Sequence, residues 1–277
     1  MAQSITDATR NAPRSNPLLR GVINTLLFLR RLTLLITLIL VWEVVAGHLL
    51  TGHTALLMPA PSEIVTAAWN LISSGRLLDH SLASLKRVGV ALLYASIAIP
   101  IGIAVGWSRI IYEQMNPLIE ILRPIPPLAW IPLSILWFGI GDGQNQFIIF
   151  LGIFFPLLLN TIAGVASIET NLIRAARCLG ASEAKVLLRV VLNAALPHIV
   201  TGMRVGIGVG WMALVAAEIV GATSGLGFLI NDARTLLRTD IIAVGMLTIG
   251  IIGLLIDLVV RTLSDIFLPW VQQRADD

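Results

Sequence analysis

Long apolar segments without charge are the sequence feature that most constrains the fold of this chain. Residues 88–107 and 147–168 contain no Asp, Glu, Lys or Arg. A helix that crosses the hydrocarbon core of a bilayer needs about 20 mostly apolar residues, so each segment is long enough to span a membrane. Charged residues make up only 13% of the 277 residues, about half of the roughly 25% typical of soluble domains. The composition therefore excludes a soluble enzyme, a disordered protein and a nucleic-acid binder.

Six segments are candidates for transmembrane helices. They are residues 32–50, 88–107, 124–140, 147–168, 205–222 and 241–260. The third is short and contains four prolines, so it is the least regular. The first follows about thirty polar and basic residues and has no small-x-small motif behind it, so we expect a retained helix rather than a cleaved signal. The prediction is an all-α integral membrane protein with six transmembrane helices.

The distribution of Lys and Arg predicts the orientation. Short cytoplasmic loops are enriched in these residues. With Arg123 and Arg204 counted at the inner ends of their spans, fourteen basic residues lie inside if the N-terminus is cytoplasmic, and five lie outside. The outer five are Arg76, Lys86, Arg87, Arg234 and Arg238. We therefore expect both termini in the cytoplasm.

The spans divide the chain into five parts. We expect a cytoplasmic tail with an interfacial helix (1–31), a first transmembrane helix (32–50), a periplasmic segment (51–84), a core of five transmembrane helices (85–265) and a cytoplasmic tail (266–277). The periplasmic segment contains a short amphipathic helix for which Ser62 is a candidate N-cap.

The cytoplasmic loop over residues 169–197 is amphipathic rather than membrane-spanning. Its pattern predicts one helix up to a turn at Gly180 and a second helix that Ser182 can cap. The apolar stripe of the second helix consists of Val186, Leu187, Val190 and Val191. Unless this face folds back onto its own bundle, it requires a soluble partner.

At this loop the sequence resembles the permease subunits of bacterial ABC importers. Their signature reads Glu-Ala-Ala, three residues, Gly, nine residues, Ile-x-Leu-Pro. Ala175, Ala176, Gly180, Val190 and Leu192 hold the matching positions, whereas Arg174 replaces the Glu and Asn193 the Pro. Residues 120–141 and 197–229 look like the nitrate, sulfonate, taurine and bicarbonate branch, and particularly like its taurine and aliphatic-sulfonate permeases. The resemblance covers roughly residues 80–265.

The resemblance implies the type I importer permease fold in the bacterial inner membrane. Such a subunit works as a pair, here expected to be a homodimer, with two cytoplasmic ATPase subunits and a periplasmic or lipid-anchored solute-binding protein. The chain has no GxxxxGK[ST] motif, so we expect ATP and Mg²⁺ on the partner ATPase, no cofactor or metal in this chain, and no enzyme activity. The expected solute is a small anion, with a sulfonate such as taurine favoured and nitrate, bicarbonate or cyanate as alternatives.

Three groups of residues are candidates for roles in transport. The ATPase-coupling residues implied by the resemblance are Arg174, Ala175, Ala176, Arg177, Leu179, Gly180, Ala181, Ser182, Val186 and Leu187. The candidates for the translocation pathway are Arg123, Pro126, Pro127, Trp130, Trp211 and Glu218. Gly202, Gly206 and Gly210 follow a small-xxx-small pattern, which favours close helix packing over solute contact.

Charged residues inside spans are costly and are candidates for function by default. Asp257 precedes Arg261 by four residues, so the simplest expectation is a pair at the inner interface. Arg204 can snorkel toward the inner surface, and Glu43 can pair or face a cavity. Glu218 fits a gate or pathway residue and a structural hydrogen-bonding group equally well.

Two other classes of membrane protein were weighed against the permease. An intramembrane serine protease needs a Gly-x-Ser-Gly site and a catalytic His, but the nearest segment, residues 222–225, begins with Ala, and the histidines lie near span ends or in loops. An ion-coupled secondary carrier predicts several intramembrane carboxylates and an internal repeat, and we find no convincing repeat. A neighbouring ATPase gene and a secreted binding-protein gene would favour the permease.

Overall fold

The computed structural model describes residues 33–34, 36–49 and 57–267 of the chain. The interfacial helix expected within residues 1–31 lies outside these described residues, and so does the tail after residue 267. Helices account for all regular secondary structure in the described part, which contains no strand. The chain divides into two units, Met1–Glu63 and Ile64–Asp277.

The first unit carries the apolar helix Ile36–Gly47, whose end overlaps the π-helix η1 (Val45–Leu49). Glu43 on this helix accepts hydrogen bonds from the backbone N of Ser62 at 3.0 Å and from its hydroxyl at 2.7 Å. Glu43 therefore has a polar partner within its own unit. The first span was expected over residues 32–50, and its ends lie outside the described residues.

The helix α4 (Pro61–Ser73) begins two residues earlier than an N-cap at Ser62 would give. The carboxylate of Glu63 accepts a hydrogen bond from the backbone N of Ala60 at 3.1 Å, as the third residue of a capping box does. Pro61 occupies the first helical position, where its missing N–H costs nothing. The prediction of Ser62 as the N-cap is therefore wrong, because Ser62 lies in the first turn.

Four apolar helical stretches of the second unit are long enough to cross a membrane. The first combines α5 (Arg76–Ala95) and α6 (Ala98–Trp107), and the second is α9 (Asp142–Ala166). The third is the continuous helix Glu183–Gly221, formed by α11 (Glu183–Lys185), the π-helix η3 (Val186–Val191) and α12 (Leu192–Gly221). The fourth is α14 (Thr239–Phe267), which follows the short helix α13 (Leu226–Thr235).

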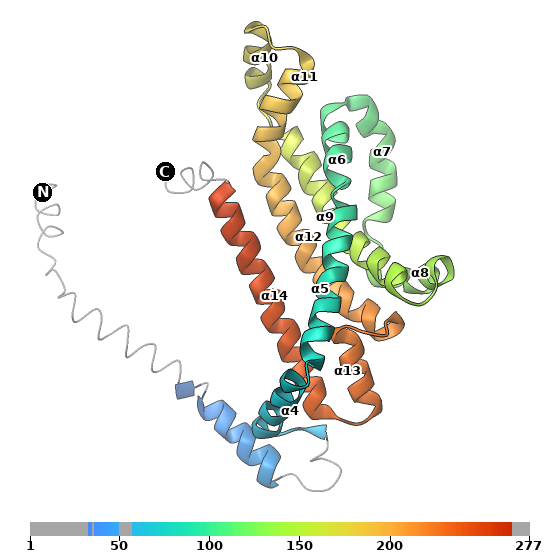
Figure 1. Ribbon diagram of the computed structural model, residues 1–277. Coiled ribbons are helices and arrows are strands. Elements are labelled where there is room, and N and C mark those ends of the chain that lie inside the picture. Colours follow the sequence, from blue (N-terminus) through green and yellow to red (C-terminus); the bar gives the residue numbers. More distant parts are fainter. Residues whose placement is uncertain (1–32, 35, 50–56, 268–277) are drawn as a thin grey trace, which may run out of the picture. The chain divides into compact units, whose positions relative to one another are not determined.

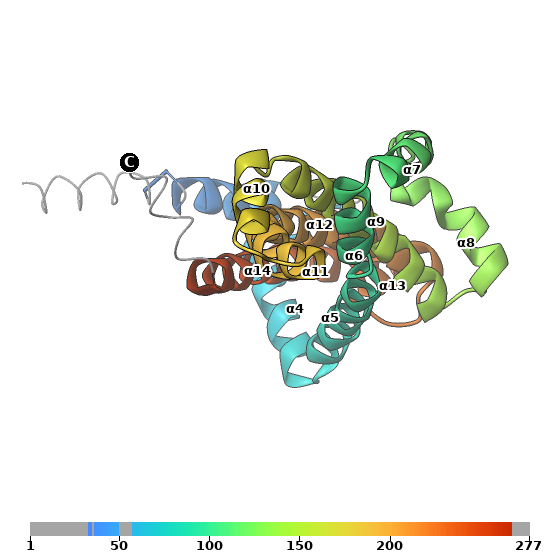
Figure 2. The ribbon, with the colours of Figure 1, turned by 90° about the horizontal axis from the view of Figure 1, so that it is seen from above.

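The central contact of the second unit is between α9 and α12 (Figures 1 and 2). Three glycines of α12 allow the two backbones to approach closely. A Cβ atom at Gly202 would lie 2.6 Å from the Cβ of Asn160, and one at Gly206 would lie 2.9 Å from the carbonyl oxygen of Ile153. A Cβ atom at Gly210 would lie 2.6 Å from Cγ1 of Ile153. The small-xxx-small spacing thus serves helix packing within this subunit.

The proline-rich third span is a broken helix rather than a single short one. Helix α7 (Arg109–Leu122) is followed by η2 (Pro127–Trp130) and α8 (Ile131–Phe138), and the two parts are bent by 83°. The prolines between them cannot donate the backbone hydrogen bonds that would continue α7. Figure 2 shows α7 and α8 on the side of α9 away from α14. The expected boundaries, residues 124–140, therefore miss α7 altogether.

The number of crossings is four in the described residues, or five if the bent pair counts as one span. The helix Ile36–Gly47 is apolar but shorter than these. The total of six spans and the cytoplasmic position of both termini stay predictions.

The turn between α13 and α14 contains the one non-glycine residue with positive φ among the described residues. Leu237 has φ 55°. Its backbone N donates to the carbonyl of Arg234 at 3.2 Å, and that of Arg238 donates to Ala233 at 2.9 Å. These bonds form a Schellman motif in which Leu237 occupies the position usually taken by glycine. The side chain is 68% exposed, so packing within the subunit does not compensate for the strain.

Replacing Leu237 with glycine is expected to stabilise the protein. The substitution removes the left-handed strain but adds freedom to the unfolded chain, which leaves a gain of about 0.5–1 kcal/mol. The midpoint of thermal unfolding in detergent measures it. Leu236 is similarly exposed but has φ −90°, so Leu236→Gly is the matched control and is expected to lower the midpoint. Equal shifts for the two variants would contradict the assignment of strain to Leu237.

Candidate functional site

The segment after α9 folds into a helix and a tight turn. Helix α10 (Thr170–Cys178) ends in a second Schellman motif. The backbone N of Gly180 donates to the carbonyl of Arg177 at 2.9 Å, and that of Ala181 donates to Ala176 at 3.1 Å. Gly180 has φ 79°, a conformation that glycine adopts without cost. The turn predicted at Gly180 is confirmed by this geometry.

An ion pair braces the turn. Arg177 Nε lies 2.8 Å from Glu183 Oε1, and Arg177 Nη2 lies 3.0 Å from Glu183 Oε2, so the end of α10 is tied to the start of α11. Ser182 stands at the N-cap position of α11, but its side chain makes no capping hydrogen bond. Both charged side chains are about half exposed or more, so the ion pair orients the turn more than it stabilises the fold.

The residues predicted to couple to an ATPase differ in their exposure. Leu179 is 89% exposed in the turn after α10, although the exposure of an apolar side chain to water is unfavourable. Ala176, Ala181 and Leu187 are partly buried. Those exposed to solvent are Arg174, Ala175, Arg177, Leu179, Gly180 and Ser182.

Val186 was expected to contact an ATPase, but it does not reach the surface of the subunit. It has no exposed surface and lies in the subunit core with Leu158, Val191 and Ala195. The stripe expected to face a partner therefore folds back onto its own bundle, because the second helix is the beginning of the long helix Glu183–Gly221 rather than a separate one. An exposed surface remains on α10, the Gly180 turn and α11.

A buried polar network occupies the opposite end of the second unit. Figure 1 shows α10 and α11 at the top and α13 at the bottom. Arg87 on α5 is only 5% exposed, and its Nη1 lies 2.7 Å from Oε1 of Glu218 on α12. Its Nε lies 2.7 Å from Asp142 Oδ1 at the start of α9. Nη1 and Nη2 also donate to the carbonyl and hydroxyl oxygens of Ser224 at 2.6 and 2.9 Å.

The carboxylate of Glu218 is fully enclosed by donors. The hydroxyl of Ser84 lies 2.8 and 3.0 Å from its two oxygens, and the backbone N of Gly227 donates to Oε2 at 2.8 Å. The backbone N of Leu226 donates in turn to Ser84 Oγ at 2.9 Å, and that of Gly225 donates to Nδ1 of His80 at 3.1 Å. The network therefore joins α5, α9, α12 and the start of α13.

This network favours the structural alternative for Glu218. A carboxylate with no exposed surface and four hydrogen-bonded contacts does not line a pathway in this conformation. Sequence reasoning missed its partners and counted Arg87 with the outer loops. The available signal was spacing, because His80, Ser84 and Arg87 lie on one face of a helix that begins at residue 76.

A cleft of about 420 Å³ lies between the broken span and the α9–α12 pair. Arg123 and Pro127 line it, together with Gly152 and Pro156 of α9 and Val209 of α12. Arg123 was expected at the inner end of a span, but it follows α7 and lies beside the middle of α9. The bend that brings it there is visible between α7 and α8 in Figure 1.

The other predicted pathway residues are not among those that line this cleft. Trp130 packs edge-on against Phe147 and tilted against Trp137. Trp211 is 8% exposed, and its indole Nε1 donates to the carbonyl of Ile249 on α14 at 3.2 Å. Pro126 is exposed between α7 and η2, outside the residues that line the cleft.

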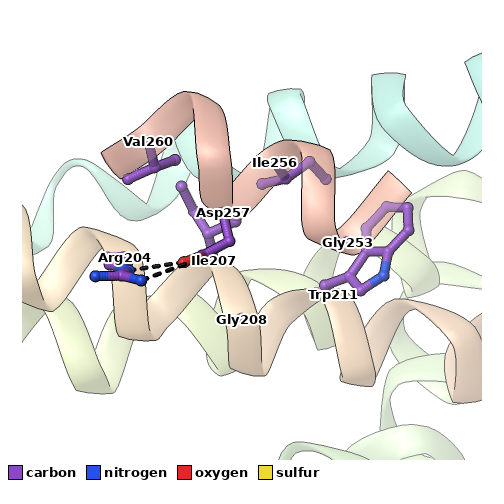
Figure 3. Close-up of a pocket in the computed structure, with 8 residues that line it drawn as sticks. All are labelled: Arg204, Ile207, Gly208, Trp211, Gly253, Ile256, Asp257 and Val260. Atoms are coloured by element: carbon purple, nitrogen blue, oxygen red, sulfur yellow. Dashed lines mark hydrogen bonds and ion pairs between the residues drawn. The ribbon is translucent and has the colours of Figure 1, made fainter. Parts of the chain in front are cut away.

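A second charged pair joins α12 to α14 (Figure 3). Arg204 Nε and Nη2 lie 2.7 and 2.9 Å from the two oxygens of Asp257, which is a bidentate arrangement. The expected pairing of Asp257 with Arg261 is therefore wrong, because a facing helix provides a closer guanidinium. A small cavity of about 60 Å³ lies beside the pair, bounded by Gly208, Trp211 and Gly253.

Comparison with known proteins gives consistent matches. The family of binding-protein-dependent transport system inner membrane components matches residues 98–273. The chain is 41% identical to the taurine transport system permease protein TauC of Escherichia coli over 86% of this chain and 88% of that protein. It is 36% identical to the putative aliphatic sulfonates transport permease protein SsuC of Bacillus subtilis, over 88% of each. Identity to the nitrate import permease protein NrtB of Leptolyngbya laminosa is 34%, over 76% of this chain and 78% of that protein.

Among solved structures, inward-facing conformations of the MetNI methionine ABC transporter contain a chain with the same fold. The TM-score is 0.53 at 21% identity, and the match covers 65% of this chain and 92% of that chain. At this level of identity the match shows the type I importer permease fold and nothing about the solute.

Substitutions at the two carboxylates that bind Arg87 are expected to differ strongly in effect. Glu218→Ala leaves a buried guanidinium without its enclosed partner, which should cost about 3–5 kcal/mol. Asp142 binds the same guanidinium, but its side chain is 65% exposed, so Asp142→Ala should cost no more than about 1 kcal/mol. Thermal unfolding of the purified protein measures both. Comparable losses would show that burial does not set the strength of this network.

Proposed function

Because the chain belongs to the family of binding-protein-dependent transport system inner membrane components, we propose that it forms, as a pair of identical copies, the pathway of an ATP-driven importer of a small anion. That it is an ABC importer permease subunit of the inner membrane follows from the family. The homodimer, the identity of its partners and the solute are the proposed parts. The proposal places catalysis outside this chain, on an ATPase that binds ATP and Mg²⁺.

The observation that carries the coupling role is the exposed surface around Gly180. The Schellman motif and the Arg177–Glu183 ion pair hold the turn in one shape, and this turn presents Leu179 to solvent. A preformed surface with an apolar centre and charged neighbours suits a soluble protein partner. We propose that the ATPase covers Leu179 and contacts Arg174, which has no ion-pair partner within the described residues.

The helix that begins at the coupling surface also forms a wall of the cleft. The helix Glu183–Gly221 runs from the Gly180 turn past Val209 to Glu218 without interruption. A movement imposed on the turn by an ATPase would therefore reach the cleft directly. The external binding protein would deliver solute at the opposite end, where the Arg87 network fixes the helix ends.

The proposed solute is a sulfonate such as taurine. The relatives named for taurine and for aliphatic sulfonates support this choice, and the nitrate permease has nearly the same identity. Nitrate, bicarbonate and cyanate are therefore the alternatives. All of these solutes share an anionic group that a guanidinium can bind.

The protease alternative gains no support from the geometry. The hydroxyl of Ser224 accepts a hydrogen bond from Arg87, and His80 accepts one from the backbone of Gly225. Among the described residues no histidine hydrogen-bonds to Ser224, so the pairing of nucleophile and base is missing there.

Gly180→Pro is expected to abolish uptake and association with the ATPase while membrane insertion stays normal. Proline fixes φ near −65° and has no N–H. It can therefore neither adopt the φ of 79° that Gly180 has nor donate the backbone hydrogen bond to the carbonyl of Arg177. Co-purification and uptake measure the effect, and membrane fractionation checks insertion. Gly180→Ala keeps the N–H and should weaken association less. Normal uptake by the proline variant would mean that this segment does not couple transport to ATP.

Uptake into proteoliposomes that contain the permease, its ATPase and its binding protein tests the solute. We expect ATP-dependent accumulation of labelled taurine, with competition by ethanesulfonate stronger than by nitrate, bicarbonate or cyanate. A reversed order of competition would replace the sulfonate with one of the other anions. Uptake that persists without the ATPase and collapses with the ion gradient would overturn the importer itself.

A further inference from the structure

The depth of Arg123 in the helix bundle is unusual for a charged residue. The cleft that it lines is otherwise formed by residues 151–159 of α9 and by Val209 of α12. Helix α9 extends over residues 142–166, so its wall residues belong to its middle, and Val209 lies about two thirds of the way along the continuous helix Glu183–Gly221. Arg123 therefore lies beside the middle of the membrane-spanning helix α9, where a charge facing lipid is strongly unfavourable.

Two arginines within the membrane-spanning helices bind carboxylates of facing helices. Arg87 binds Glu218 and Asp142, and Arg204 binds Asp257. Arg123 is exposed, and none of the ion pairs or side-chain hydrogen bonds of the described residues includes its guanidinium. A cation at this depth without an internal partner requires water or an anion from outside the subunit.

The chemistry of the cleft selects among ligands. The guanidinium is the only charged group among the lining residues, and the walls are apolar side chains, prolines and Gly152. A volume of about 420 Å³ is within the range of small-molecule sites. A planar guanidinium binds two oxygens of an oxyanion in parallel hydrogen bonds, and it repels cations.

We propose that Arg123 is the solute-contacting residue of the pathway and binds the oxyanion group of the solute midway through the membrane. The apolar walls would accommodate the short carbon chain of an alkanesulfonate. Because no carboxylate competes for the guanidinium in the described residues, the anion can bind and leave as the bundle changes conformation. This inference rests on the proposed function and adds the residue and the chemistry of recognition.

The test compares Arg123→Gln, Arg123→Lys and Arg109→Gln in proteoliposomes that contain the complete importer, with labelled taurine and labelled nitrate as probes. Arg109 begins the same helix, and its side chain is 91% exposed and pairs with Glu113, so it is the matched control. We expect Arg123→Gln to lower the uptake rate about tenfold or more, as the loss of a charge-assisted pair implies. Arg123→Lys should retain an intermediate rate, and Arg109→Gln the rate of the unmodified protein.

Two further readouts separate recognition from assembly. In Arg123→Gln, co-purification with the ATPase and stimulation of ATP hydrolysis by the loaded binding protein should stay within about twofold of the unmodified protein, because Arg123 lies in the cleft and not on the coupling surface. A factor of two corresponds to about 0.4 kcal/mol. Uptake at the normal rate by Arg123→Gln would overturn the proposal. So would a loss of assembly together with uptake, because Arg123 would then support the fold. A failure of the unmodified complex to import any small anion would instead refute the proposed function. The proteoliposomes with the unmodified importer show that outcome independently of the variants.

Discussion

The close approach of α9 and α12 is the contact on which the rest of the second unit depends. Lipid provides no hydrophobic driving force between helices, so association depends on packing at short range. Gly202, Gly206 and Gly210 provide it by letting α12 lie against the backbone of α9 near Ile153. Gly152 lies on the α9 side of the same contact, and a Cβ atom there would lie 3.1 Å from the Cα of Gly210. The cleft, the coupling segment and the buried network are all attached to this pair.

The charges of the second unit include two groups with different surroundings. Those that join helices are paired at short distances, as Arg87 is with Glu218 and Arg204 is with Asp257. Two others, Arg123 in the cleft and Arg174 on the exposed helix α10, have no ion-pair partner among the described residues. The subunit therefore separates charges that hold it together from charges available to molecules outside it.

The sequence predicted the helical membrane fold, the turn at Gly180 and the family, because apolar length and glycine position are local properties of the chain. It did not predict the partners of Arg87 or Asp257. These residues pair across helices that are far apart in sequence, and hydropathy contains no information on that distance. The third span was misplaced for a related reason: α7 is amphipathic and contains Arg109, Glu113 and Glu120, so a criterion based on charge excluded it. The resemblance implied that Val186 meets the ATPase, and only the packing shows that its own bundle covers it.

The continuous helix Glu183–Gly221 has a mechanical consequence. Its 39 residues correspond to a rod of about 58 Å at 1.5 Å per residue. Gly206, the central glycine of the contact with α9, divides this rod into arms of about 35 Å toward Glu183 and about 22 Å toward Gly221, so the contact can act as the fulcrum of a lever. A tilt of roughly 10° about that point would displace the end at Glu183 by about 6 Å and the end at Gly221 by about 4 Å, in opposite directions. A displacement at the Gly180 turn would then produce a smaller displacement in the opposite direction at the Arg87 network.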